Sequence, residues 1–477
     1  MINSPTTLSQ KFWITNGACH ANYAIVFAQT IVKGKNEGVN GFIVRIRDDQ
    51  MKPCKGVFIE DMGVKLGLNG IDNARLLFDH VRIPRSNMLN SFNDVNEKGE
   101  FTSDVKKVSA RFFKVADRLL SGRLCISAMT LSATKMCLSL TIRYSQQRLA
   151  IGASGESDTP IMSYQLQQNA VLPLLARAIV LNIGYNKAKD LFENPTGQEH
   201  TQIRVFCACK CLISWNMETT ARICRERCGG GSYLASAGIP SVVEGAHSGM
   251  TAEGDNRVLM QKVVKDILAD FQKKRHPMPS MTMCPKREIP NKKRVSDLET
   301  LTNLIYYREV AEIKNISGRM QKMVMEDGKP FFDAWMYELS DEQQALAAAF
   351  GERYNLEAVL EKYNQCTHTG VQMLLYHAIM LHCLSLVHQN IGWYLANGIV
   401  SVEAATELED AQLAAVKTFV PFINTAVEGL GIVTFPEYNS PITRDYVAFN
   451  NQDDNENLTA AGPLFDFRTT GMPRAKL

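Results

Sequence analysis

The apolar pattern of the chain changes near Asp104, and this change limits the possible fold more than any other feature. Before it, short runs rich in Val, Ile and Phe are separated by Gly, Asn, Asp and Lys turns, which is typical of strands. These runs predict a small antiparallel sheet and cover residues 23–33, 41–46, 56–60 and 74–81. After it, apolar residues recur with the helical period, so the rest of the chain is predicted to be mainly α.

Long amphipathic helices follow the change of period. They are predicted to run from about Asp104 towards Arg148, over 164–192, over 202–227, and from near Glu253 to residue 271. The third helix is expected to end at Gly229-Gly230-Gly231, because glycine accepts the positive φ of a helix C-cap. Four long helices with short connections favour an antiparallel bundle.

A proline-rich, basic segment interrupts the helical pattern before it resumes. This segment is either a solvated interdomain linker or a basic strip that contacts phosphate. The later helices are predicted over residues 298–326, 340–349, 356–363, 369–397 and 402–420. The sequence therefore predicts a partial β domain (1–100), a helical bundle (104–272), a linker (273–294) and a second helical domain (295–477).

Composition excludes several classes of protein. The 477 residues include 52 Lys and Arg against 49 Asp and Glu, a net charge of +3, so nothing indicates a nucleic-acid partner. No apolar run reaches roughly 18 uninterrupted residues, so no membrane span is expected. The most apolar stretch, 371–400, contains His377, His382 and His388 without metal spacing, and we expect them to be core or interface groups.

Twelve cysteines without a secretory leader indicate reduced thiols rather than a disulfide framework. Five of them form a cluster: Cys207, Cys209, Cys211, Cys224 and Cys228. The cluster lacks the CxxC pairs or Cys/His spacing of a zinc site. We therefore predict small buried apolar side chains and no metal.

Common catalytic and nucleotide-binding signatures are absent from the sequence, including GxGxxG after a strand, GxxxxGK[ST], HExxH and GxSxG. Three unusual segments remain. The first is Lys11-Phe12-Trp13-Ile14-Thr15-Asn16-Gly17. The second joins residues 143–152 to Tyr164-Gln165-Leu166-Gln167-Gln168, and the third joins residues 227–233 to Thr251-Ala252-Glu253-Gly254-Asp255-Asn256.

In this order and spacing, the segments resemble the acyl-CoA oxidase branch of the acyl-CoA dehydrogenase flavoprotein superfamily. Residues 61–73 and Val81-Arg82-Ile83-Pro84-Arg85 are similar to the oxidase version of the β domain. The resemblance implies a four-helix flavin-binding bundle, a small antiparallel β domain, a second C-terminal helical domain, FAD as cofactor and a homodimer.

The resemblance also implies site residues. Trp13 and Thr15 match the segment that flanks the flavin ring near N5. Arg148, with Gln165 or Gln168 and the glycines Gly229, Gly230 and Gly231, matches the group that holds the dinucleotide across a dimer interface. Without the resemblance, Trp13 would be interpreted as a core aromatic and Arg148 as a solvated helix end.

Glu253 matches the catalytic base of the family's Glu-Gly-Glu/Asp-Asn signature. A carboxylate suits proton removal α to a thioester because it is ionised in the free enzyme and loses its solvent when substrate binds. Considered alone, the segment would be a helix N-terminus with Asp255 as the capping acid.

The implied reaction converts acyl-CoA to trans-2-enoyl-CoA, and in an oxidase O2 becomes H2O2. The helices at 295–470 are typical of oxidases, and Ala475-Lys476-Leu477 resembles a peroxisomal address read by an import receptor. The resemblance starts almost at Met1, so we expect the family's N-terminal helical domain to be missing. Two alternatives stay open: a catalytically impaired isoform that acts only as a dimer partner, and an acyl-CoA dehydrogenase-like enzyme.

Overall fold

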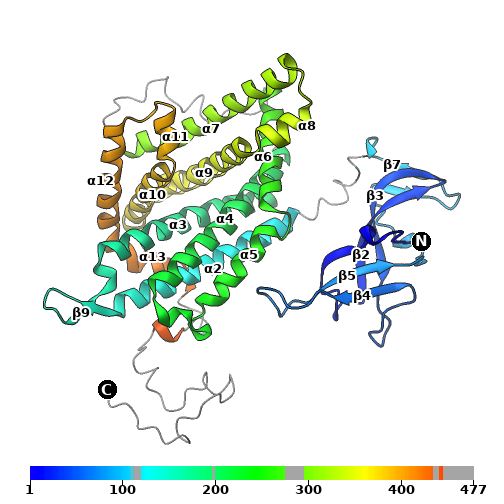
Figure 1. Ribbon diagram of the computed structural model, residues 1–477, viewed down its shortest axis with the longest axis horizontal. Coiled ribbons are helices and arrows are strands. Elements are labelled where there is room, and N and C mark those ends of the chain that lie inside the picture. Colours follow the sequence, from blue (N-terminus) through cyan, green and yellow to red (C-terminus); the bar gives the residue numbers. More distant parts are fainter. Residues whose placement is uncertain (109–110, 112–119, 196–198, 274–294, 433–439, 444–477) are drawn as a thin grey trace, which may run out of the picture. The chain divides into compact units, whose positions relative to one another are not determined.

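The computed structural model describes the chain except for residues 109–110, 112–119, 196–198, 274–294, 433–439 and 444–477 (Figure 1). It forms two compact units, Met1–Gly122 and Arg123–Leu477. The first unit contains most of the strands, and the second contains the long helices and one short hairpin, as the change of apolar period predicted for the two parts of the chain. The predicted basic linker lies almost entirely outside the described residues, and so does the C-terminal tripeptide.

The first unit is built from short antiparallel strands. Their bounds are β1 Lys11–Thr15, β2 Tyr23–Val32, β3 Lys35–Arg45, β4 Val57–Asp61, β5 Asn73–Phe78, β6 Asn93–Val95 and β7 Phe101–Ser103. Pairing divides them into a three-stranded sheet, β1-β5-β4, and two hairpins, β2-β3 and β6-β7. The sheet and the β2-β3 hairpin share one apolar core, in which Val26, Val44 and Leu76 are almost completely buried.

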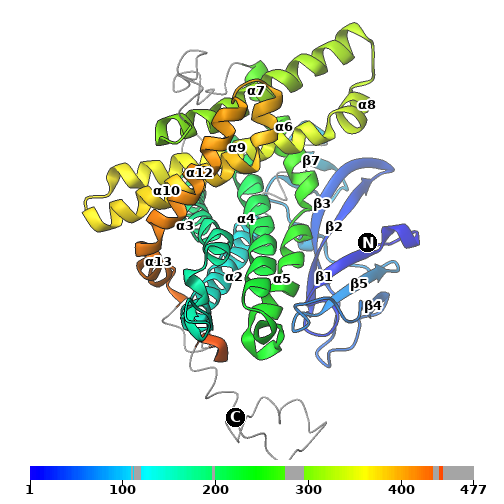
Figure 2. The same ribbon diagram turned by 60° about the vertical axis from the view of Figure 1, so that its left-hand side comes forward.

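The second unit begins with the predicted bundle. Its helices and one short hairpin are α2 Leu120–Gln147, β8 Leu149–Ile151, β9 Ser157–Pro160, α3 Gln165–Glu193, α4 Glu199–Arg227, α5 Ile239–Thr251 and α6 Asn256–Gln272. Gly229 ends α4 as expected, with φ 66° and its N–H bonded to the Glu226 carbonyl (N to O 3.1 Å). The separate helix α5, which the sequence analysis missed, runs beside α4 (Figure 2).

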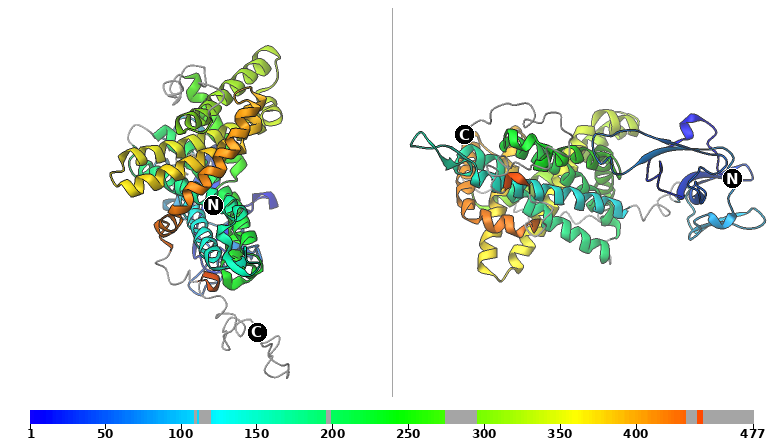
Figure 3. Two further views of the ribbon diagram at one scale, coloured as in Figure 1. Left: turned by 90° about the vertical axis from the view of Figure 1, so that its left-hand side faces the viewer. Right: turned by 90° about the horizontal axis from the view of Figure 1, so that it is seen from below.

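Further helices follow: α7 Leu298–Gln321, α8 Phe331–Asp333, α9 Ser340–Gln365, α10 Thr369–Gln389, α11 Ile391–Ala396, α12 Val402–Phe419 and α13 Ile423–Gly429. They pack against the bundle within the same unit: α9 contacts α3, α4 and α6, while α10 and α12 contact α3 (Figure 3). The segments before and after the predicted linker therefore belong to one compact body, and the predicted boundaries remain a prediction.

Three described helices are long and apolar enough to cross a membrane by length and composition: α2, α3 and α10. The search for an uninterrupted apolar run missed them because Ser, Thr and Gln are spread through their sequences. In each helix, between 50% and 56% of the most apolar 18-residue stretch is buried inside the unit. Packing against neighbouring helices therefore accounts for much of this apolar surface.

A buried ionic cluster joins α3, α9 and α10. Arg177 contacts both oxygens of Glu352, at 2.6 Å (Nη2 to Oε1) and 3.2 Å (Nη1 to Oε2). His382 is 1% exposed, and its Nε2 lies 3.9 Å from Glu352 Oε2. Burial and the charge of Arg177 lower the pKa of His382 from 6.5 to about 4, against the opposing effect of Glu352. The folded unit therefore holds this imidazole neutral at pH 7.

We expect this histidine to make the helical unit acid-sensitive. Since its pKa is lower in the folded state, its stabilising contribution is complete above pH 6.5 and is lost as the pH falls towards about 4, by up to about 3 kcal/mol. Urea unfolding at a series of pH values measures this slope. His382→Gln should flatten it, whereas His388→Gln, at a more exposed position of α10, should not; equal slopes in all three proteins would contradict the prediction.

Candidate functional site

Glu253 lies in the short turn between α5 and α6, and its side chain is exposed. Its backbone has φ 57°, and the following Gly254 has φ 104°. A left-handed conformation is unfavourable for a residue with a Cβ and persists only where the surroundings impose it. The turn therefore presents the carboxylate to solvent on a backbone held in an uncommon conformation.

Asp255 explains why α6 starts at Asn256, three residues after Glu253. Its Oδ1 accepts hydrogen bonds from the N–H groups of Arg257 (2.9 Å) and Val258 (3.4 Å), as an N-cap does. The prediction that Asp255 is the capping acid is confirmed. Because Asp255 satisfies the helix start, the Glu253 carboxylate has no capping role.

Lys210 also contacts this turn, and the sequence analysis missed it. It comes from α4 and is completely buried, with Nζ 2.7 Å from the Gly254 carbonyl oxygen. The available signal was a lysine inside a helical segment whose other members are apolar or cysteine, from Phe206 to Ile213. A charged side chain at such a position is rarely buried without several partners.

A second group of predicted site residues meets at the C-terminal end of α4. Arg148 directly follows α2, is exposed, and accepts a hydrogen bond on its backbone carbonyl from Ile161 N–H (2.9 Å). Gln165 and Gln168 lie in the first turn of α3. Between them, Gln167 points inward and donates to Ser145 Oγ (2.7 Å) and to the Arg227 carbonyl (3.2 Å). This buried glutamine ties together the ends of α2, α3 and α4.

The glycine turn after α4 offers open backbone. A Cβ built on Gly230 would meet no heavy atom within 4 Å among the described residues, and one on Gly231 would meet only Ile442, at 3.9 Å. Ser232 fixes the turn by donating to the carbonyls of Arg225 (2.7 Å) and Gly229 (2.8 Å). Packing within the described chain does not require glycine at these two positions, whereas close approach of an outside group such as a phosphate would. These residues fit the dinucleotide group that the resemblance implies.

The two groups lie at different positions along α4, one beside its middle and the other at its C-terminal end. Lys210 contacts the Glu253 turn, whereas Arg227 contacts Gln167 and precedes the glycine turn. With a rise of about 1.5 Å per residue, the helix between Lys210 and Arg227 separates them by about 25 Å. A single chain therefore does not bring Glu253 next to Arg148 or the glycines.

Trp13 and Thr15 belong to the first unit, on β1. Trp13 is 62% exposed and has φ 57°, at a register irregularity between β1 and β5. The alternative of a core aromatic is therefore wrong, since the bulge turns the indole out to solvent. Thr15 is also exposed and pairs with Asn73.

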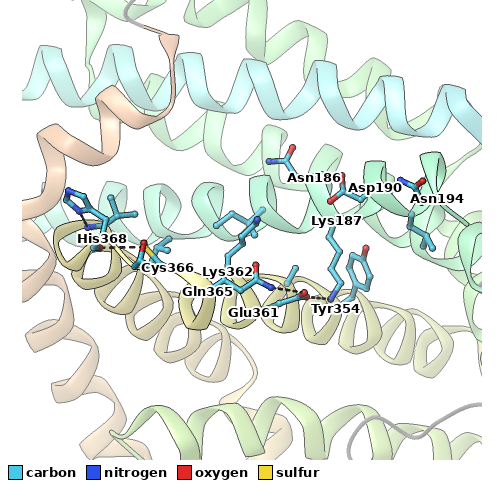
Figure 4. Close-up of a pocket in the computed structure, with 16 residues that line it drawn as sticks. Asn186, Lys187, Asp190, Asn194, Tyr354, Glu361, Lys362, Gln365, Cys366 and His368 are labelled. Atoms are coloured by element: carbon cyan, nitrogen blue, oxygen red, sulfur yellow. Dashed lines mark hydrogen bonds and ion pairs between the residues drawn. The ribbon is translucent and has the colours of Figure 1, made fainter.

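A groove of about 950 Å³ lies along α3, α9 and the start of α10, and none of its lining residues was predicted as a site residue. Figure 4 shows Lys187 of α3 reaching Glu361 of α9, with Nζ 2.8 Å from Oε2, and Gln365 bonded to the same carboxylate. Three of its polar side chains, Lys187, Glu361 and Gln365, thus bond one another.

The cysteine cluster, which lies in α4 and directly after it, is buried, as predicted. Burial raises the pKa of the Cys209 and Cys224 thiols to about 12 and that of Cys228 to about 11, which keeps them protonated and poor metal ligands.

A different group, Cys19, His20 and Asp72 in the first unit, places three possible metal ligands close together. Asp72 already has a structural role, because its Oδ2 accepts from the backbone N–H of Ala18 (2.5 Å) and Cys19 (3.0 Å). Burial raises the pKa of Asp72, but the hydrogen bonds from His20, Cys19 and Ala18 outweigh it and lower the pKa to about 2. The carboxylate is thus accounted for as the acceptor that closes the turn after β1.

Two family models match this chain. The model described as "Acyl-CoA oxidase, C-alpha1 domain" matches residues 117–268, and the model described as "Acyl-CoA oxidase" matches residues 297–422, so together they cover more than half of the chain.

Curated relatives agree with the family models. Peroxisomal acyl-coenzyme A oxidase 3 of Arabidopsis thaliana is 31% identical over 76% of this chain and 55% of its own length. A mouse acyl-coenzyme A oxidase-like protein is 29% identical over 93% of this chain and 76% of its own length. The chain thus spans about half the length of the Arabidopsis protein.

Solved structures share the fold. Acyl-CoA oxidase 1 of Arabidopsis thaliana aligns with a TM-score of 0.85 at 23% identity, over 99% of this chain and 74% of that one. Acyl-CoA oxidase-1 of Caenorhabditis elegans, complexed with FAD and ATP, aligns with a TM-score of 0.81 at 21% identity, over 93% of this chain and 67% of that one.

Proposed function

Because the chain belongs to the acyl-CoA oxidase family, we propose that it converts acyl-CoA to trans-2-enoyl-CoA and that O2 is reduced to H2O2. One observation carries the proposal: Glu253 is exposed on a left-handed backbone, while Asp255, two residues later, satisfies the helix start. This arrangement leaves one carboxylate available as the base.

Glu253 takes the proton from the carbon α to the thioester carbonyl. The polarised carbonyl accepts hydrogen bonds that stabilise the developing enolate, and a backbone N–H of the Glu253 turn is the expected donor from this chain. Closure of the site over the substrate removes water from the carboxylate and increases its basicity towards the α carbon.

FAD is the cofactor of the proposal, since a related oxidase is complexed with FAD. Trp13 and Thr15 would hold the ring, and Arg148, Gln165, Gln168 and Gly229–Gly231 would hold the dinucleotide. The flavin supplies a two-electron acceptor that O2 can reoxidise. Arg148 contributes a planar cation suited to a phosphate, and the open glycine turn offers backbone N–H groups.

A homodimer is part of the proposal. The turn that carries the base lies beside the middle of α4, and the dinucleotide-binding group lies at the C-terminal end of α4, about 25 Å away by helix geometry. A second copy of the chain would supply the dinucleotide-binding end to the flavin whose ring faces the first copy's Glu253. The compartment is the peroxisome, because the names of several curated relatives describe them as peroxisomal. Recognition of Ala475-Lys476-Leu477 by an import receptor stays a prediction.

The test is to purify the full chain, record its absorption spectrum, and measure enoyl-CoA and H2O2 with a long-chain acyl-CoA in air. We expect a flavin spectrum and one H2O2 for each enoyl-CoA formed. Substrate reduction with slow reoxidation by O2 would favour the dehydrogenase-like alternative. A colourless, inactive chain that still dimerises in sedimentation would contradict the oxidase and favour the impaired dimer partner.

A further inference from the structure

Lys210 is one of the largest completely buried side chains of the protein. Its ammonium group has three N–H donors and meets three oxygen acceptors: the carbonyls of Met250 (3.2 Å) and Gly254 (2.7 Å) and the side-chain Oδ1 of Asn256 (2.8 Å). Each donor therefore has one acceptor. All three acceptors are neutral and lie within seven consecutive residues around Glu253.

These acceptors lie on both sides of Glu253 in the chain. Met250 is in the last turn of α5, where helix carbonyls lack partners within the helix and the helix dipole favours a cation. Gly254 directly follows Glu253, and Asn256 is the first residue of α6. The ammonium therefore joins the end of one helix, the turn and the start of the next helix.

A second layer of hydrogen bonds fixes Asn256. Its Nδ2 donates to Ser214 Oγ (3.0 Å), and Ser214 lies one turn after Lys210 on the same face of α4. Ser214 Oγ in turn donates to the Cys211 carbonyl (3.2 Å), and Cys211 Sγ approaches the Asn256 carbonyl (3.5 Å). A buried polar network with its members satisfied holds one geometry.

A buried lysine destabilises the fold if its side chain only fills space. Burial lowers the pKa of Lys210, because it disfavours the charged form. An apolar side chain of similar length would fill the same volume without that penalty, so the charge must be explained by its contacts. Those contacts restrain the backbone on each side of Glu253, whose φ is 57°.

We propose that Lys210 is a positioning residue for the catalytic base. It anchors the turn between α5 and α6, so that Glu253 keeps its left-handed backbone and its carboxylate keeps its orientation towards the substrate. The proposal rests on the proposed function, in which Glu253 removes the α proton. Lys210 itself lies beneath the turn and acts through the Gly254 and Met250 carbonyls and not on the substrate.

The structural test is hydrogen–deuterium exchange of the full-length chain as purified, which requires no activity. In Lys210→Met, the amides from residue 250 to 258 should exchange at least about tenfold faster than in the wild type, while those in the middle of α3 should be unchanged. Lys265→Met, the same substitution at an exposed position of α6, is the matched control and should leave the turn unchanged. Wild-type protection of the turn in Lys210→Met would overturn the proposal.

The kinetic test separates positioning of the base from a general structural role. A misplacement of about 1 Å can reduce a rate about 100-fold, so kcat of Lys210→Met should fall by about that factor with KM changed less than about twofold. The kinetic isotope effect with α-deuterated acyl-CoA should rise, because proton removal becomes the slow step. Lys210→Arg, which keeps a cationic donor, should recover part of kcat. A lower kcat with an unchanged isotope effect and no recovery in Lys210→Arg would count against positioning.

A second variant covers the case in which Lys210→Met does not fold. Asn256→Ala removes one of the three acceptors and leaves the lysine in place, and it should speed exchange of the same amides by a smaller factor. Unchanged exchange in Asn256→Ala would then refute the anchoring role. If the wild-type chain lacks oxidase activity, the proposed function fails while exchange still decides whether Lys210 orders the turn.

Discussion

Glu253→Gln should lower the rate of enoyl-CoA formation by about 10³-fold, because the amide cannot accept the α proton and general-base catalysis contributes roughly 10²- to 10⁴-fold. Glutamine keeps the shape of the side chain, and an exposed position tolerates the loss of charge. The flavin spectrum and the thermal unfolding midpoint should therefore match those of the wild type. Steady-state assay of enoyl-CoA and H2O2 measures the effect.

The matched control for this variant is Glu244→Gln. Glu244 is exposed on α5, so it tests the same chemical change nine positions earlier in the chain. Its activity should stay within about twofold of the wild type. Activity retained in Glu253→Gln would remove Glu253 as the base, whatever the result for Lys210.

Arg353→Met should lower the free energy of unfolding of the helical unit by about 3–5 kcal/mol, the typical cost of removing one partner of a buried ion pair. Arg353 of α9 and Glu309 of α7 have side chains only 5% and 2% exposed, and Arg353 Nη1 also lies 2.7 Å from Glu357 Oε2. Without Arg353, the buried carboxylate of Glu309 loses the positively charged guanidinium group that it contacts. Urea unfolding followed by helical circular dichroism measures the change.

Two further variants make this prediction specific. Glu309→Leu in the Arg353→Met background should restore much of the stability, because it removes the unpaired buried charge. Lys187→Met breaks the exposed pair with Glu361 and should cost less than about 1 kcal/mol. Equal effects of Arg353→Met and Lys187→Met would show that burial does not control the energy of these pairs.

Local features of the fold followed from the sequence. The strands at 23–32, 57–61 and 73–78 lie within a few residues of their predicted positions, since alternating Val, Ile and Phe report a buried strand face. Asp255 and Gly229 took their predicted capping roles, because each acts on atoms within a few residues of itself. The helix expected from Glu253 began at Asn256, since the capping geometry and not the apolar pattern sets the first turn.

The directions of the site side chains depended on tertiary packing. Gln165 and Gln168 stay predictions from the resemblance, and the structure adds Gln167, which joins three helix ends because α3 turns that side chain inward. Trp13 was expected in the core if no flavin faced it, and a bulge in β1 exposes it instead. In each case a side chain's direction depends on its own element's packing against others, which the sequence pattern reports only weakly.

The sequence by itself determined the types of element, the family, and the candidate base, because periodicity, caps and short motifs depend on residues close together in the chain. Only the tertiary structure decided that Lys210 lies beneath the Glu253 turn, 44 positions away from Gly254 in the chain. It also decided that the base lies beside the middle of α4, while the glycine turn follows the C-terminal end of that helix. Such long-range pairings arise when helices pack their apolar faces together, and many sequences with the same local pattern could pack them differently.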